Sequence, residues 1–157
     1  MKYSQIIGIL ASLALLGICF LPWVYIPSLN LYLTGLNGRA SSELSFGIQI
    51  KSHGFFVAIM ILCFIVEKVW AKRTNFFIGA INFAWAIKNY LIFSICRSGE
   101  CPEKQPGIYF LVFVAFLLFL MTLFPKMDLN SKEWLTISVK DIHIIVIVMP
   151  VWIAIFE

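Results

Sequence analysis

Charge is scarce in this sequence, and acidic side chains are missing from its long apolar stretches. Only 13% of the 157 residues are charged, whereas 61% are hydrophobic; a soluble domain is roughly 45 to 50% apolar. No aspartate or glutamate lies within 6–26, 75–96 or 107–124. Proton-coupled carriers usually relay protons through intramembrane carboxylates. The composition therefore indicates a membrane protein and weighs against a proton-coupled transporter.

Motifs of catalysis are also absent from the sequence. The chain has no phosphate-binding glycine loop, no nucleophile elbow and no helix-borne His-Glu zinc motif. His53 and His143 do not have the spacing of metal ligands. The formal charge of +4 is modest and spread over short segments. We therefore expect no enzyme, no cofactor, no metal site and no nucleic-acid partner.

Long apolar runs define the expected fold. About 20 apolar residues are needed for a helix to cross the hydrocarbon of a bilayer. Such runs predict an all-α polytopic membrane protein, an antiparallel four-helix transmembrane bundle in a single domain over 1–157. A fifth hydrophobic helix is expected at the C-terminal end, if Lys140 reaches the interface. The expected helices are 6–26, 53–70, 75–96, 107–124 and 136–156.

Between the first two runs the pattern changes to a period of two. Apolar and polar side chains alternate from Ser28 to Thr34 and again from Leu44 to Lys51. This alternation is typical of strands with one buried face. Asn37 and Gly38 between them favour a tight turn. We expect an extracytoplasmic β-hairpin over 28–51, with an irregular loop as the alternative.

Basic residues suggest the orientation. They cluster between the second and third runs, where Lys68, Lys72 and Arg73 mark a cytoplasmic side by the positive-inside rule. With the N-terminus inside, seven basic residues lie inside and four outside. The inside group is Lys2, Lys68, Lys72, Arg73, Lys126, Lys132 and Lys140, against Arg39, Lys51, Arg97 and Lys104 outside. We expect a multi-pass protein of the cytoplasmic (inner) membrane with a cytoplasmic N-terminus.

The run 75–96 carries polar residues that lipid does not favour. Asn75, Asn82 and Asn89 recur every seven residues and share one helix face with Gly79 and Ala86. Amides between small residues are typical of a helix-packing surface, because amides can form hydrogen bonds between membrane helices. This face is the expected contact with the rest of the bundle.

Lys88 has no obvious partner at its own depth. The predicted intramembrane polar site consists of Lys88, Asn82, Asn89 and Trp85. Pro22 cannot donate a helical hydrogen bond to the Ile18 carbonyl, and that carbonyl lies at a similar depth. We therefore expect Lys88 to donate to the Ile18 carbonyl or to a water beside it. The alternative is a functional site at Lys88 for an ion or an anionic headgroup.

The four cysteines are of two kinds. Cys19 and Cys63 lie in apolar runs and are expected to be packing residues. Cys96 and Cys101 flank a short loop on the expected oxidising side, so we expect a structural disulfide. A redox-active pair is the alternative. Quinone-linked thiol oxidoreductases of four helices resemble the chain only in size, and their second extracytoplasmic cysteine pair is missing.

Several motifs resemble a group of small, uncharacterised bacterial four-helix membrane proteins. These motifs are Cys19-Phe20-Leu21-Pro22-Trp23, Asn82-Phe83-Ala84-Trp85-Ala86-Ile87-Lys88-Asn89 and Cys96-Arg97-Ser98-Gly99-Glu100-Cys101-Pro102-Glu103. The resemblance covers roughly 6–125 and implies no particular activity. The layout is also similar to the claudin-like arrangement, by analogy alone, because that family's first-loop Trp-Gly-Leu-Trp and cysteine pair are missing.

These observations lead to one expected function and two alternatives. We expect a non-enzymatic interaction or scaffold subunit, with the lipid bilayer and a membrane-protein partner or further copies of the chain as its partners. The first alternative is a small-molecule or lipid-binding carrier that uses Lys88. The second is a thiol-disulfide oxidoreductase that uses Cys96 and Cys101.

Overall fold

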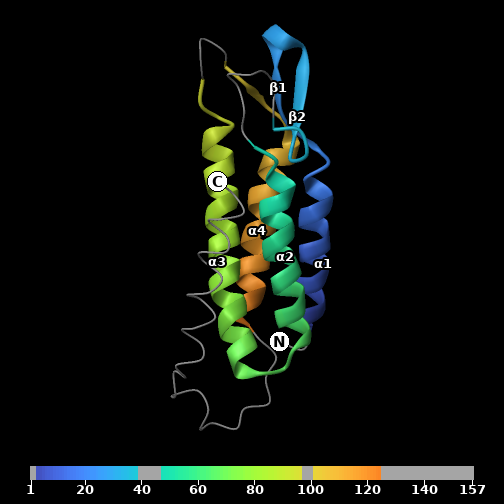
Figure 1. Ribbon diagram of the computed structural model, residues 1–157, viewed down its shortest axis with the longest axis vertical. Helices are drawn as coiled ribbons and strands as arrows, with labels where there is room; N and C mark the ends of the chain where they lie inside the picture. The colour runs from blue at the N-terminus through green and yellow to red at the C-terminus, as the bar shows by residue number, and fades with distance from the viewer. Residues whose placement is uncertain (1–2, 39–46, 97–100, 125–157) are drawn as a thin grey trace.

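The computed structural model describes residues 3–38, 47–96 and 101–124. In this part of the chain four α-helices lie side by side, and a small antiparallel sheet covers one end of them (Figure 1). The helices are α1 (Ser4–Ile18), α2 (Gln49–Ile65), α3 (Val69–Ile92) and α4 (Pro106–Leu123). We call these four helices the helical body. The predicted fifth helix, 136–156, lies outside the described residues.

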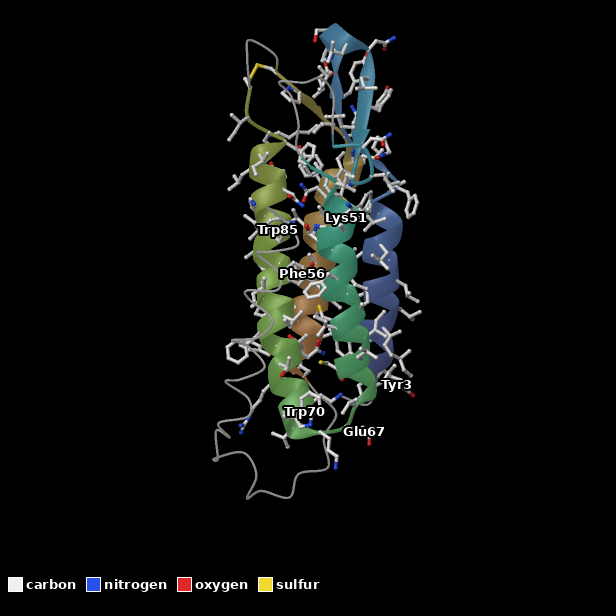
Figure 2. The ribbon with its side chains drawn as sticks, in the orientation of Figure 1. Tyr3, Lys51, Phe56, Glu67, Trp70 and Trp85 are labelled. Carbon is white, nitrogen blue, oxygen red and sulfur yellow. A yellow bond between two sulfur atoms is a disulfide. The ribbon has the colours of Figure 1, made fainter. Side chains whose placement is uncertain are left out.

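Two stretches are long and apolar enough to cross a membrane, namely Val69–Ser94, which contains α3, and Pro106–Leu123, which is α4. Helices α1 and α2 are also apolar but shorter. Each helix packs against two others, α1 on α2 and α4, and α3 on α2 and α4. The core between them is made of aliphatic and aromatic side chains, among which Leu15, Met60 and Leu118 are fully buried. Figure 2 shows Phe56 in this interior.

The first predicted helix, 6–26, is wrong in its second half. Helix α1 ends at Ile18, and Pro22–Ile26 forms strand β1. An apolar run alone does not distinguish helix from strand. Pro22 has no N–H to continue the helix, and the β-branched and aromatic residues that follow it favour extended backbone. The Ile18 carbonyl accepts instead from the Leu21 N–H at 3.1 Å.

The predicted hairpin over 28–51 is also corrected. Strand β1 pairs with β2 (Leu31–Thr34), and a short 3₁₀ helix, η1 (Pro27–Leu29), turns the chain between them. Asn30 closes this turn with a φ of 47°, which asparagine tolerates better than most residues. The expected second strand was 44–51; its residues from Gln49 onward begin α2, and 44–46 lie outside the described residues.

The third strand was not predicted. Strand β3 (Glu103–Lys104) pairs with β1, so the strand order is β2-β1-β3. Beyond it, the Gln105 N–H donates to the Trp23 carbonyl at 2.8 Å. Two residues are too short to show an alternating pattern, so the sequence carried no signal for this strand. The strand ties the start of α4 to the chain that leaves α1.

A bulge in β1 directs Trp23 into the helical body. The pairing of β1 with β2 shifts between Pro22 and Val24, so Trp23 has no partner residue on β2. Bulges redirect side chains in this way. The Trp23 side chain is fully buried, and its indole N–H donates to the Ile18 carbonyl at 3.0 Å. This indole joins the sheet to the end of α1.

The bounds of the other helices differ from the prediction by a few residues. Helix α2 runs from Gln49 to Ile65 rather than over 53–70, and α3 runs from Val69 to Ile92 rather than over 75–96. Of the basic residues expected in a loop, Lys68 caps the start of α3, and Lys72 and Arg73 belong to its first turns. Lys72 is buried and donates to the carbonyls of Cys63 and Phe64, at 3.1 and 2.9 Å. It thereby satisfies carbonyls that the end of α2 leaves without helical donors. Helix α4 agrees closely with the predicted 107–124, and Pro106 stands at its first turn, where proline is favoured.

Gly107 sits where the start of α4 meets β1, and a side chain at this position would overlap the Pro22 carbonyl. We expect Gly107→Ala to lower the free energy of unfolding by about 1–3 kcal/mol, because backbone would have to move. Gly17→Ala is the matched control, since its added methyl would meet nothing within 4 Å. Thermal unfolding of both variants in detergent measures the difference. Equal melting temperatures would contradict this close contact.

Candidate functional site

A buried cluster of three polar side chains links α2 to α3. The His53 Nδ1 lies 2.8 Å from Asn82 Oδ1, and Asn89 Nδ2 lies 3.2 Å from His53 Nε2. His53 and Asn82 are 0% exposed and Asn89 is 1% exposed. The two asparagines are seven residues apart on α3, so they place an amide on each side of the ring. We call these three residues the histidine cluster.

The hydrogen bonds define the protonation state of the imidazole in this arrangement. An amide oxygen only accepts, so the His53 Nδ1 carries a proton and donates it to Asn82. An amide nitrogen only donates, so the His53 Nε2 accepts from Asn89. A neutral imidazole satisfies both contacts at once. The cluster therefore puts a polar ring in an apolar interior without placing a charge there.

Two amide atoms on the same face of α3 are buried without a partner. In the described part of the chain, neither the Asn82 Nδ2 nor the Asn75 Oδ1 has a hydrogen bond. Asn75 borders a crevice with Lys72 and Thr122 at the end of the helical body away from the sheet, and that crevice is too narrow to admit a water molecule. The crevice thus offers no room for a ligand.

Aromatic rings close the histidine cluster on the side of the sheet. The ring of Trp23 packs edge to face against His53, with centroids 6.5 Å apart, and against Phe93 at 5.5 Å. Trp23 and Phe93 are both fully buried. The cluster is therefore sealed between the sheet and the interior of the helical body.

The structure contradicts the expected contact between Lys88 and the Ile18 carbonyl. Lys88 is exposed on the outer surface of α3, and its ammonium nitrogen lies 3.8 Å from the centroid of the Trp85 ring. The Ile18 carbonyl accepts from Trp23 instead. Adjacent residues on a helix point about 100° apart, so with Asn89 turned inward Lys88 is directed away. The sequence placed Lys88 and the Ile18 carbonyl at a similar depth, but it did not show that the Lys88 side chain points away from the interior.

Trp85 lies between the interior and the surface. Its indole N–H donates to Gln49 Oε1 at 3.1 Å, and Figure 2 shows it on α3 toward the sheet. The four residues of the predicted polar site are thus divided: Asn82 and Asn89 lie inside, Lys88 lies outside, and Trp85 is half-buried between them.

The partners of these residues on α2 were missed from the sequence. His53 and Gln49 are four residues apart and therefore share one face of α2, the face turned to α3. The available signal was their spacing of four beside the spacing of three between Asn82 and Trp85. The order of partners reverses between antiparallel helices, so Gln49 comes opposite Trp85 and His53 comes opposite Asn82.

Cys96 and Cys101 form a disulfide, as predicted. Both cysteines are exposed, at the end of the molecule that carries the sheet (Figure 2). Cys19 and Cys63 are free thiols and buried. Over the described ranges no three His, Cys, Asp or Glu residues are grouped in a way that could hold a metal ion.

Replacing His53 by leucine should destabilise the helical body. The substitution leaves Asn82 Oδ1 and Asn89 Nδ2 buried without partners, and we expect a loss of about 1–3 kcal/mol in unfolding free energy. Lys88→Met is the control on the neighbouring surface, where little change is expected. Thermal unfolding in detergent compares the two variants, and an equal effect of both would contradict a structural role for the cluster.

Comparison with known proteins gives no match for this chain. No family model matches its sequence, and neither a curated protein nor a solved structure is significantly similar to it. The two resemblances drawn from its motifs and layout remain predictions, and a function has to be inferred from the geometry itself.

Proposed function

We propose that this chain is a multi-pass membrane protein that acts as a non-enzymatic interaction subunit. Its four helices would form a transmembrane bundle that carries the sheet outside the membrane. Large apolar side chains on the outer surfaces of the helices support this placement, because water would not favour them and lipid would. Examples are Leu10 on α1, Leu62 on α2 and Phe113 on α4, which are 61 to 63% exposed.

The two ends of the helical body differ in a way that supports one orientation. The start of α1 and the turn between α2 and α3 lie at one end, and the sheet lies at the other (Figure 1). Lys68 and Arg73 belong to the first end, which by the positive-inside rule would be cytoplasmic. The Cys96–Cys101 disulfide belongs to the sheet end, and disulfides persist in oxidising compartments.

A groove beside the sheet carries the proposal. It has a volume of about 380 Å³, and it is lined by residues of β2 and of the segments that follow it, namely Leu31, Tyr32, Leu33, Leu36, Asn37, Gly38, Gly47 and Ile48. Strand β2 is at the edge of the sheet, and no described strand pairs with its second side. An edge strand next to apolar side chains suits an extended polypeptide segment, which can add backbone hydrogen bonds along the edge.

The interior of the bundle supports an interaction role over a carrier role. His53, Asn82 and Asn89 bond to one another, and Trp23 and Phe93 cover them. Lys88, which a carrier was expected to use, lies on the outer surface. We therefore propose that the partner is a protein segment outside the membrane, bound in the groove beside β2.

The groove can be tested by photo-crosslinking in native membranes from a reactive residue at Ile48, which is 49% exposed. A discrete protein should be captured. Leu31 also lines the groove, and Leu31→Asp should lower the yield of this product about tenfold, equivalent to 1.4 kcal/mol of binding free energy. Leu29→Asp is the matched control, because Leu29 is exposed on the same hairpin but does not line the groove. No captured protein, or equal losses in both variants, would contradict the proposal.

Substitution of Cys96 and Cys101 distinguishes the proposed function from redox catalysis. Cys96→Ser or Cys101→Ser should cost about 2 kcal/mol of stability, because each opens a short closed loop. Crosslinking from Ile48 should survive at temperatures below unfolding. A reductant should lower the melting temperature of the wild type but not that of the double variant. Accumulation of a mixed disulfide with another protein in either single variant would instead favour an oxidoreductase.

A further inference from the structure

The surface of α3 presents one cation without a counter-charge. Among the described residues, the Lys88 ammonium forms no ion pair, and it lies over the face of the Trp85 ring, 3.8 Å from the ring centroid. Helices α1 to α4 contain no aspartate or glutamate at all. In a bilayer this ammonium would face lipid, where an uncompensated charge is costly. Something outside the helical body must therefore compensate it.

The position of the ammonium is held from inside the protein. The side chain of a helical residue leans toward the N-terminal end of its helix, so Lys88 leans toward Trp85 and away from the sheet end. The indole is itself fixed by its hydrogen bond to Gln49, which is 9% exposed. Gln49, Trp85 and Lys88 thus form a chain of contacts from α2 to the outer surface of α3.

This arrangement keeps the charge below the outer boundary of the proposed bundle. Lys88 is four residues before the end of α3 at Ile92, about 6 Å along the axis at 1.5 Å per residue. The lean onto Trp85 carries the ammonium deeper still. A lipid phosphate at the boundary would have to descend to meet it, whereas a side chain from a neighbouring transmembrane helix lies at the right depth.

The residues around Lys88 on this surface suit helix packing. Phe77, Ala84 and Leu91 are exposed on α3 and follow one another at a spacing of seven residues. Residues spaced in this way share one helix face, and Lys88 falls between Ala84 and Leu91. We call this set with Lys88 the lysine face. Its small residue, Ala84, allows a second backbone to approach one turn from the charge.

We propose that the lysine face docks a transmembrane helix of another protein, which places an aspartate or glutamate against Lys88. Charge complementarity selects this occupant, and the absence of acidic residues from α1 to α4 means that those helices of a second copy could not supply the carboxylate. The proposal rests on the proposed membrane placement and interaction role. It adds a contact within the membrane to the groove outside it.

Photo-crosslinking from Leu91, one turn from Lys88, tests the lysine face in native membranes. The expected product joins Leu91 to a transmembrane segment with a carboxylate within two turns of the linked residue. Lys88→Met should lower its yield about tenfold or more, because the partner's carboxylate would then be buried without a counter-charge. Lys88→Arg should retain it. Lys104→Met is the matched control, since Lys104 also lies over an aromatic ring, 5.3 Å from Tyr90, but on the sheet.

Exchanging the charges of Lys88 and of its partner distinguishes loss of the contact from loss of the crosslinked product through misfolding. Lys88→Glu should abolish the product, and replacing the partner's carboxylate with lysine should restore it. Products with lipid alone, with residues of the same chain, or with a yield unchanged by Lys88→Met would overturn the proposal. If a protein is still captured from Ile48 but none is captured from Leu91, the lysine face is rejected and the proposal for the groove is retained. Loss of both would reject the interaction role as well.

Discussion

The hydrogen bonds between α2 and α3 fix how these two helices lie against each other. In an apolar interior a buried polar group without a partner is costly, so each polar side chain restricts the positions that its neighbours can take. Gln49 meets Trp85, His53 meets Asn82 and Asn89, and Lys72 meets the carbonyls at the end of α2. All of these contacts agree on one antiparallel register. A slip of one residue would break several of them together, whereas apolar contacts alone would tolerate it.

Trp23 connects this register to the sheet. Its indole N–H binds the end of α1, and its ring packs on His53 from α2 and on Phe93 at the end of α3. Its carbonyl accepts from Gln105 just before α4. One residue, turned inward by a bulge, therefore touches the ends of all four helices. Strand β2, which lines the groove, pairs with the strand that carries Trp23.

Predictability from the sequence varied with the kind of information needed. The bounds of α4 were predicted closely, because a proline at the first turn followed by an uninterrupted apolar run of about 18 residues indicates a helix that starts there. The Cys96–Cys101 disulfide followed from two cysteines around a short loop. Strand β1 was missed because Pro22–Ile26 is as apolar as the helix before it. The direction of Lys88 was missed because spacing gives the angle between side chains on α3, and only the packed partners show which angle points inward.

The connections of the helical body are unequal at its two ends. At the sheet end, β-pairing, the Trp23 joint and a disulfide link the chain that leaves α1, the end of α3 and the start of α4. At the other end, the short turn between α2 and α3 is the chain connection within the described ranges, and Lys72 lies across it. The sheet end therefore holds the end of α1, the end of α3 and the start of α4 at fixed spacing through links outside the helices themselves. At the opposite end, the spacing of the described helices depends on side-chain packing and on the single turn between α2 and α3.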